Sequence, residues 1–282
     1  MTKEGTLVHI DGRPALRFER RYPSPVDRVW RAVTDPAEMA AWFPSNVEGE
    51  RAVGAELTFV DDDQRAAARQ AGEPTRDDGP MFRGRVVAYD PPNVFSFTWG
   101  GELLRFELTP DGDGTRLVFT QLVSHQSVAA RNGAGWHACL AALDGVLGGE
   151  GPAGGDEGWQ EVYRDYLVRM GPERGAPAGN GSLRWERATH VGPDRVREVT
   201  ADPGAWGAAD HAGEPLNWDV EGTDDGTLYR LTHEGIQGDA ELAATWHALL
   251  IQLDMYLAAG QLVPVEPDPW RDDYRQLLGG AS

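Results

Sequence analysis

The chain has almost no cysteine or lysine and no long hydrophobic run. Cys139 is the only cysteine among 282 residues, which excludes an intramolecular disulfide and a metal site built from several cysteines. Lys3 is the only lysine, and the formal net charge is −19. This charge disfavours binding to nucleic acids, whose phosphates attract basic proteins, and docking on anionic membranes. No uncharged apolar run approaches the roughly 18 residues of a membrane span, and the N-terminus has no signal-peptide core. We therefore predict a cytoplasmic protein with no membrane insertion.

Motifs for catalysis, metal binding and cofactor binding are also lacking. The sequence contains no H-E-x-x-H, no G-x-S-x-G and no phosphate-binding loop, so we predict no metal, no cofactor and no catalytic residue. Cys139 lies in an apolar helical run and is interpreted as a small buried thiol. His137 and His247 each follow a tryptophan, and we interpret both as structural histidines at the surface or boundary of a helix.

An internal repeat is the strongest positive signal. Trp136-His137-Ala138 recurs 110 positions later as Trp246-His247-Ala248. Arg17-Phe18-Glu19-Arg20 matches Arg184-Trp185-Glu186-Arg187 at a spacing of 167, and Asp113-Gly114-Thr115 matches Asp225-Gly226-Thr227 at a spacing of 112. The drop in spacing means that the second copy lacks about 55 residues, between roughly Phe43 and Gly101 of the first copy.

The repeat predicts the domain organisation. We expect a complete domain over residues 1–170 and a truncated copy of it over residues 183–282. Between them, residues 171–182 read GPERGAPAGNGS, a composition typical of a flexible linker.

Hydrophobic periodicity indicates the elements of the first copy. A strand is expected at 15–21, short helices at 26–33 and 38–42, and a long helix near 127–147. Further strands are expected at 56–60, 82–89, 94–99, 103–109 and 116–122, with turns at 90–93 and 111–114. This order predicts an α+β fold in which a curved antiparallel sheet grips a long C-terminal helix. The sheet faces carry aromatic side chains, and the pattern leaves open whether these fill a core or line a cavity.

Several motifs resemble a known family. They are VWRAVTDPAEMAAWF at 29–43, the G-x-V…DPP…F-x-W pattern from Gly84 to Trp99, the D-G-T-x-L turn and the GW-x-x-x-L-x-x-L helix. Together they resemble the START-like, helix-grip (SRPBCC) superfamily, and within it relatives of the activator of the Hsp90 ATPase. The resemblance covers about residues 15–170 well and 183–278 incompletely.

The resemblance implies an elongated apolar pocket between the sheet and the long helix. Many members of the superfamily bind lipids, sterols or polyketides, and some are polyketide cyclases. Others, in producers of enediyne antibiotics, confer self-resistance. The ligand-binding residues implied here are Trp42, Phe43, Phe82, Phe95, Phe97, Trp99, Phe106, Phe119, Trp136 and Leu140. The truncated copy would have too few strands to enclose a pocket, so we expect it to pack against the first domain or, in a homodimer, against another chain.

Three functions follow as alternatives. The first is non-catalytic binding of an apolar or polycyclic small molecule, for sequestration or antibiotic self-resistance. The second is an aromatase/cyclase-type enzyme, in which an inward arginine would hold an enolate. However, four arginines on the predicted strands alternate with the aromatic residues: Arg83, Arg85, Arg105 and Arg116. We interpret them as part of an outer face, paired with acids such as Glu102 and Glu107. The third is a co-chaperone-like interaction protein. Because no catalytic constellation is present, the residues favour binding over catalysis.

Overall fold

The computed structural model divides the chain into two compact units. It describes residues 4–60, 82–148, 159–170, 174–189, 191–223, 226–236, 238–260, 262 and 264–279. The first unit comprises residues 1–124 with 132–156, and the second comprises 125–131 with 157–282. Among the described residues, no helix is both long enough and apolar enough to cross a membrane.

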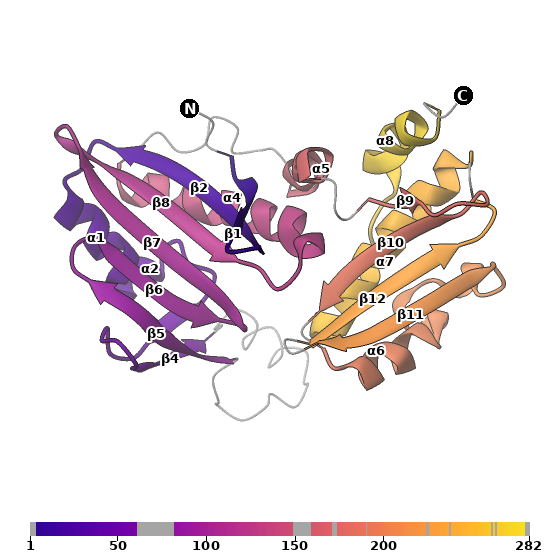
Figure 1. Cartoon of the computed structure of the whole chain (residues 1–282), viewed down its shortest axis with the longest axis horizontal. Helices are drawn as coiled ribbons and strands as arrows, with labels where there is room; N and C mark the ends of the chain where they lie inside the picture. The colour runs from indigo at the N-terminus through magenta and orange to yellow at the C-terminus, as the bar shows by residue number, and fades with distance from the viewer. Residues whose placement is uncertain are drawn as a thin grey trace. The chain divides into compact units, whose positions relative to one another are not determined.

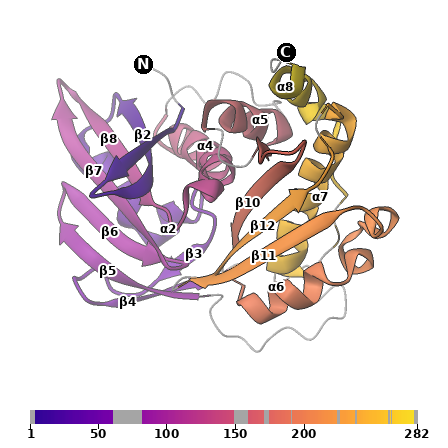
Figure 2. The same ribbon diagram turned by 45° about the vertical axis from the view of Figure 1, so that its right-hand side comes forward.

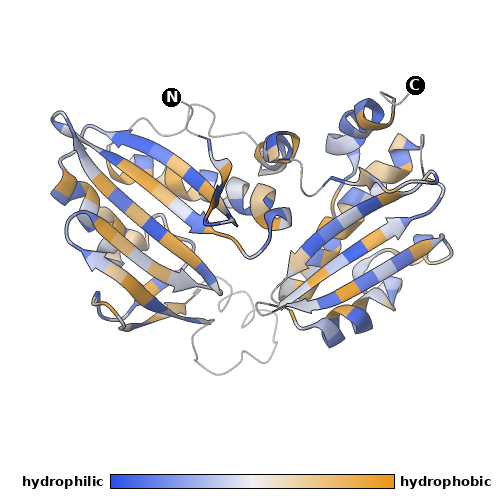
Figure 3. Ribbon diagram, in the orientation of Figure 1, coloured by the Kyte–Doolittle hydropathy of each residue, from blue (hydrophilic) through white to orange (hydrophobic). Residues whose placement is uncertain are grey.

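The first unit is built on an eight-stranded antiparallel sheet (Figure 1). Its spatial order is β1-β2-β8-β7-β6-β5-β4-β3. The strands are β1 (Thr6–Ile10), β2 (Arg13–Tyr22), β3 (Asn46–Glu48), β4 (Glu56–Val60), β5 (Phe82–Asp90), β6 (Val94–Trp99), β7 (Glu102–Asp111) and β8 (Gly114–Leu122). Hydrophobic and polar residues alternate along them, as Figure 3 shows, because successive strand residues face opposite sides of a sheet.

Helices cover one face of this sheet. They are α1 (Val26–Thr34), α2 (Pro36–Met39) and α4 (Ala129–Val146). The 3-10 turn η1 (Gln126–Val128) and the first three residues of α4 group with the second unit. Figure 2 shows α2 and α4 on the same side of the curved sheet. The predicted α+β helix-grip architecture is confirmed, and the predicted elements are found within a few residues of their expected ends. The sequence analysis missed β1 and β3, which are short and lie at the two edges of the sheet.

The second unit has a smaller sheet of the same type. Its order is β11-β12-β10-β9, formed by β9 (Ala176–Pro177), β10 (Leu183–Thr189), β11 (Leu216–Thr223) and β12 (Gly226–His233). The helical elements are α5 (Trp159–Met170), α6 (Pro193–Thr200), η2 (Pro203–Trp206), η3 (Ala209–His211), α7 (Ala240–Ala259) and α8 (Asp268–Gly279).

The two sheets share their strand pairing and register. In the first unit β2 pairs with β8 and β8 with β7, and in the second β10 pairs with β12 and β12 with β11. The residue pairs that face each other across neighbouring strands are also equivalent under the spacings of the sequence repeat. Between the first and second strands of this set, Arg20–Leu117 corresponds to Arg187–Tyr229, and Phe18–Phe119 corresponds to Trp185–Leu231. On the other side, Phe106–Phe119 corresponds to Trp218–Leu231. The second sheet therefore corresponds to β7-β8-β2-β1, and β3 to β6 have no counterpart among its described strands.

A buried ion pair links the first long strand to the long helix in each unit. The pairs and their N–O distances are Arg20–Asp144 at 3.7 Å and Arg187–Asp254 at 3.5 Å. A tyrosine hydroxyl donates to each aspartate, but Tyr22 lies on β2 whereas Tyr229 lies on β12. The same polar contact is thus made by a tyrosine from a different strand of each sheet.

The unit boundaries differ in two places from the predicted ones. Helix α5 was expected to end the first domain, but it groups with the second unit, where Tyr163 contacts Trp270 at a ring distance of 6.5 Å. Part of the segment predicted as a linker, Ala176–Pro177, forms β9 and pairs with β10. This segment belongs to the sheet because it is hydrogen-bonded to a neighbouring strand. The linker prediction was based on composition, which carries no information about such pairing.

Candidate functional site

Aromatic side chains gather between the sheet and α4 of the first unit. Strands β6, β7 and β8 supply Phe95, Phe97, Phe106 and Phe119, α4 supplies Trp136, and Trp42 and Phe43 follow α2. All seven are at most 5% exposed. The rings lie in direct contact, with centroids 4.5 Å apart for Phe119 and Trp136 and 5.6 Å apart for Phe43 and Trp136. The structure therefore brings together most of the predicted ligand-binding residues in one packed aromatic cluster.

The other three predicted residues have different surroundings. Leu140 is fully buried on α4, one turn after Trp136. Trp99 is half-buried at the rim of the cluster, with its ring 5.8 Å from Phe43 and 5.7 Å from Trp136. Phe82 begins β5, but its side chain lies outside the described part of the chain.

A buried carboxylate beside this cluster was missed by the sequence analysis. Glu102 was interpreted as a partner of surface arginines, but it is only 5% exposed. Gln121 Nε2 donates to Glu102 Oε2, and the other Gln121 atom, Oε1, accepts from Trp136 Nε1 at 2.7 Å. The backbone N–H of Ser124 and the amide of Asn132 also donate to this carboxylate, at 3.3 and 3.4 Å. Glu102 is the first residue of β7, so alternation along the strand did not place it reliably. Its hydrogen-bond partners come from later segments, β8, the residues after it and α4.

The second unit has a related arrangement, in which histidines surround the carboxylate. Glu214 Oε2 accepts from Trp246 Nε1 at 2.7 Å and contacts His233 Nε2 at 2.6 Å, and Glu214 Oε1 lies 2.5 Å from His211 Nδ1. Partial burial opposes ionisation of Glu214, but these hydrogen bonds together hold its pKa below the ordinary value. No group of three His, Cys, Asp or Glu side chains in the described residues has the geometry to hold a metal ion.

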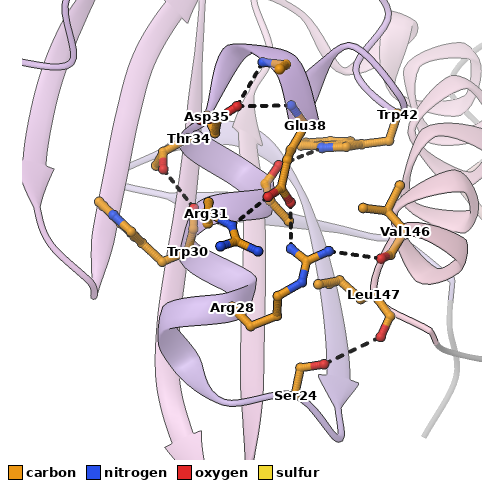
Figure 4. A network of polar contacts seen from close by, with 12 residues as sticks. Ser24, Arg28, Trp30, Arg31, Thr34, Asp35, Glu38, Trp42, Val146 and Leu147 are labelled. Carbon is orange, nitrogen blue, oxygen red and sulfur yellow. Dashed lines mark hydrogen bonds and ion pairs between the residues drawn. The ribbon is translucent and has the colours of Figure 1, made fainter.

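A polar network fixes the segment that carries Trp42 and Phe43 (Figure 4). Glu38 of α2 accepts from Arg28 Nη1 at 2.5 Å and from Arg31 Nε at 2.6 Å, both on α1. Arg28 also donates to the carbonyl of Val146 at 3.1 Å, which ties α1 to the last turn of α4. Trp42 Nε1 donates to the carbonyl of Ala32 at 2.9 Å. The position of Trp42 is therefore set by α1, α2 and the end of α4 together.

A shallow depression opens to solvent beside this segment. Its volume is about 290 Å³, and it is lined by Ala40, Ala41, Trp42, Phe43, Ala138, Cys139 and Ala142. Burial raises the pKa of the Cys139 thiol to about 11, so the group is a protonated thiol at neutral pH. Cys139 is partly exposed, whereas the sequence predicted a buried thiol, but its raised pKa favours a structural role over a nucleophilic one.

The arginines on the strands lie away from the aromatic cluster. Arg83 pairs with Glu56 at 2.6 Å, Arg105 with Glu107 at 3.0 Å and Arg116 with Glu19 at 2.6 Å. Arg85 is exposed and donates to the carbonyl of Gly54 at 2.7 Å. The predicted outer face of arginine–acid pairs is confirmed, except that Glu102 is buried.

The two repeated histidines differ in their surroundings. His137 is partly exposed on α4, in line with the prediction of a boundary residue. His247 is fully buried, which corrects the prediction for this residue. Helix α8 packs on α7, and its Trp270 ring stacks on the His247 ring at 4.6 Å. The sequence pattern of α7 alone did not show that a later helix covers this face.

Comparison with known proteins finds a family model that matches part of the first unit. Residues 23–148 match the family described as activator of Hsp90 ATPase homolog 1-like protein. Among solved structures, CalU16 from Micromonospora echinospora is 20% identical, with 61% of this chain and 99% of that chain covered and a TM-score of 0.45. A conserved protein of unknown function, EF2215 from Enterococcus faecalis, is 19% identical over 59% of this chain and 90% of that one, with a TM-score of 0.44.

A third similar structure is the protein encoded by gene BPP1335 from Bordetella parapertussis. It is 28% identical over 59% of this chain and 91% of that chain, with a TM-score of 0.42. Comparison with curated proteins finds no match. The family match covers the helices, strands and motifs on which the resemblance was based. Residues 23–148, which make up most of the first unit, match the model of the activator of Hsp90 ATPase homolog 1-like family.

Proposed function

We propose that the first unit binds an apolar, polycyclic small molecule against Trp42 and Phe43, without catalysis. The observation that carries this proposal is the depression beside α2 and α4, which has Trp42 and Phe43, two of the ten predicted ligand-binding residues, in its wall. Its remaining lining consists of four alanines and Cys139, so no long side chain blocks the approach of a flat ring system. The volume of about 290 Å³ lies just below the range of typical ligand-binding pockets, which is about 300–1,000 Å³.

The aromatic cluster behind the depression supports the same class of ligand. Phe43 contacts Phe97 at 6.0 Å and Trp136 at 5.6 Å, so a ring placed on Phe43 would extend a continuous series of aromatic contacts. Binding would be driven by burial of apolar surface, at about 25 cal/mol per Å². Sequestration of a natural product, the predicted homodimer and the cytoplasmic location remain parts of the proposal.

Tryptophan fluorescence with a panel of polycyclic aromatic compounds tests this function. We expect saturable quenching by at least one compound, and we expect Ala142→Phe to weaken it about tenfold or more by filling the depression. Ala37→Phe is the matched control, because Ala37 is an exposed alanine of α2 outside the lining. Absence of saturable binding, or equal binding by the two variants, would overturn the proposal. Conversion of a poly-ketone compound would instead favour the cyclase alternative.

A further inference from the structure

Strand β11 forms one edge of the second sheet. It is hydrogen-bonded to β12 on one side, and no described strand pairs with its other side. Its counterpart in the first unit, β7, is followed by β6 at this position. The second sheet therefore ends at β11, whereas the first sheet continues past the equivalent strand, β7, into β6.

The backbone groups that face outward from this edge can be identified by comparison with β7. In the first unit the N–H of Leu108 donates to the carbonyl of Asn93, on the β6 side, at 2.8 Å. Val220 occupies the position of Leu108, since each pairs with the equivalent residue of the next strand, Tyr229 or Leu117. Because strand residues alternate in direction, Val220 and Trp218 both present backbone groups away from β12. Arg197 of α6 reaches the carbonyl of Val220 at 3.1 Å, which agrees with this direction.

The core-facing side of the edge leaves an aromatic ring partly uncovered. In the first unit Phe106 is fully buried, and Phe97 of β6 stacks on it at 6.2 Å. Trp218, at the position of Phe106, is only half-buried. Its ring contacts among the described residues are with Trp206 and Tyr229, each at 6.3 Å. An apolar side chain placed where Phe97 lies in the first unit would cover Trp218.

The opposite face of the edge is acidic. The side chains of Asp219 and Glu221 are 63% and 59% exposed. Arg230 contacts both, at 2.9 and 3.1 Å, and also pairs with Glu186 at 2.7 Å. Three carboxylates therefore share one guanidinium group, which leaves negative charge along this face. A second copy of the chain, paired through the same strand, would bring like charges together across the strands, and such pairs are destabilising.

We propose that β11 accepts an extended segment of another protein as an added strand. In this segment apolar side chains alternate with basic ones, so that the apolar set covers Trp218 and Val220 and the basic set faces Asp219 and Glu221. The N–H of Val220 and the backbone groups of Trp218 hydrogen-bond to the added strand, as in other proteins that bind peptides by strand addition. This interaction surface belongs to the second unit and is independent of the ligand proposed for the first.

A synthetic peptide tests the proposal on the full chain. The probe is a fluorescein-labelled, C-terminally amidated peptide, Lys-Phe-Lys-Val-Lys-Phe-Lys, and its binding is followed by fluorescence anisotropy at low salt. We expect saturable binding that weakens as salt is added. A peptide with glutamate at every lysine position should bind at least about tenfold more weakly. Equal binding of the two peptides, or no binding of the lysine peptide, would overturn the proposal.

Substitutions at the edge locate the binding. Val220→Pro removes an N–H that faces away from β12, so the β11–β12 pairing is retained while peptide affinity falls about tenfold or more. Val220→Thr keeps the N–H and the β-branched shape, and should bind as the unmodified chain does. If Val220→Pro disturbs folding, as judged by circular dichroism, the double variant Asp219→Asn/Glu221→Gln should weaken binding and reduce its salt dependence. Unchanged binding in a folded Val220→Pro variant, or a concentration-dependent dimer that this substitution abolishes, would contradict the proposal.

Discussion

At the scale of single residues, His247 shows how burial sets a protonation state. Its Nδ1 lies 3.0 Å from the hydroxyl oxygen of Tyr274. That oxygen accepts hydrogen bonds from the N–H of Gly175 and from Trp185 Nε1. The Tyr274 proton is therefore directed to His247, whose ring accepts it as a neutral imidazole. Burial, together with the positive charges of Arg187 and Arg174, holds the pKa of His247 well below 6.5.

The stability of the second unit should therefore decrease in mild acid. Below about pH 6.5 the unfolded chain takes up a proton at His247 and the folded chain does not, so the free energy of unfolding falls by about 1.4 kcal/mol per pH unit. Urea unfolding between pH 7.5 and 5.5 measures this slope. His247→Gln, which cannot be protonated, should show a flatter dependence, and an identical slope in that variant would contradict the assignment.

At the scale of elements, equivalent residues at the start of a short helix make different contacts in the two units. Asp35 caps α2, accepting from the N–H of Ala37 at 2.9 Å and of Glu38 at 3.2 Å. Asp202, 167 positions later, precedes η2 and makes no side-chain cap. The backbone angles differ accordingly, with ψ of 125° at Asp35 and 83° at Asp202. The repeated Asp-Pro pair thus starts an α-helix in one unit and a 3-10 turn in the other.

Substitution of the two aspartates should have unequal effects. Asp35→Ala removes a helix cap and should lower the free energy of unfolding by about 1 kcal/mol, whereas Asp35→Asn should retain most of it. Asp202→Ala should cost less than half as much, since no cap is lost. Urea denaturation of the three variants measures the differences. Equal losses for the two alanine variants would show that the Asp35 contacts contribute little.

At the scale of the whole molecule, the two sheets share a pattern of strand pairing but differ in where the sheet ends. Around β7 the first sheet continues into four further strands, while β11 pairs with β12 alone among the described strands. Hydrogen exchange of individual amides should report this difference, because backbone N–H groups without a strand partner exchange readily.

We expect alternating exchange along β11. The amides of Trp218 and Val220 should exchange much faster than those of Phe106 and Leu108, their counterparts on β7. Within β11, Asp219 and Glu221, whose N–H groups face β12, serve as protected controls. Exchange measured by NMR distinguishes the residues, and equal protection of neighbouring β11 amides would contradict the predicted edge.

The sequence by itself determined the local elements, the family resemblance of the first unit and the spacing of the repeat. Strand alternation, helical periodicity and turn residues are properties of short segments, so the predicted strands from 56–60 to 116–122 are found close to where they were expected. The match over residues 23–148 likewise rests on motifs readable from the chain.

Tertiary structure alone decided which of these elements meet. The pattern of β7 did not show that Glu102 is buried and hydrogen-bonded to Gln121, the partner of Trp136, and the pattern of α7 did not show that Trp270 covers His247. The grouping of α5 with the second unit and the open edge of β11 were also not readable from composition. The physical reason is the same in each case: burial and pairing depend on segments distant in the chain, whereas periodicity reports only which residues of one segment share a face.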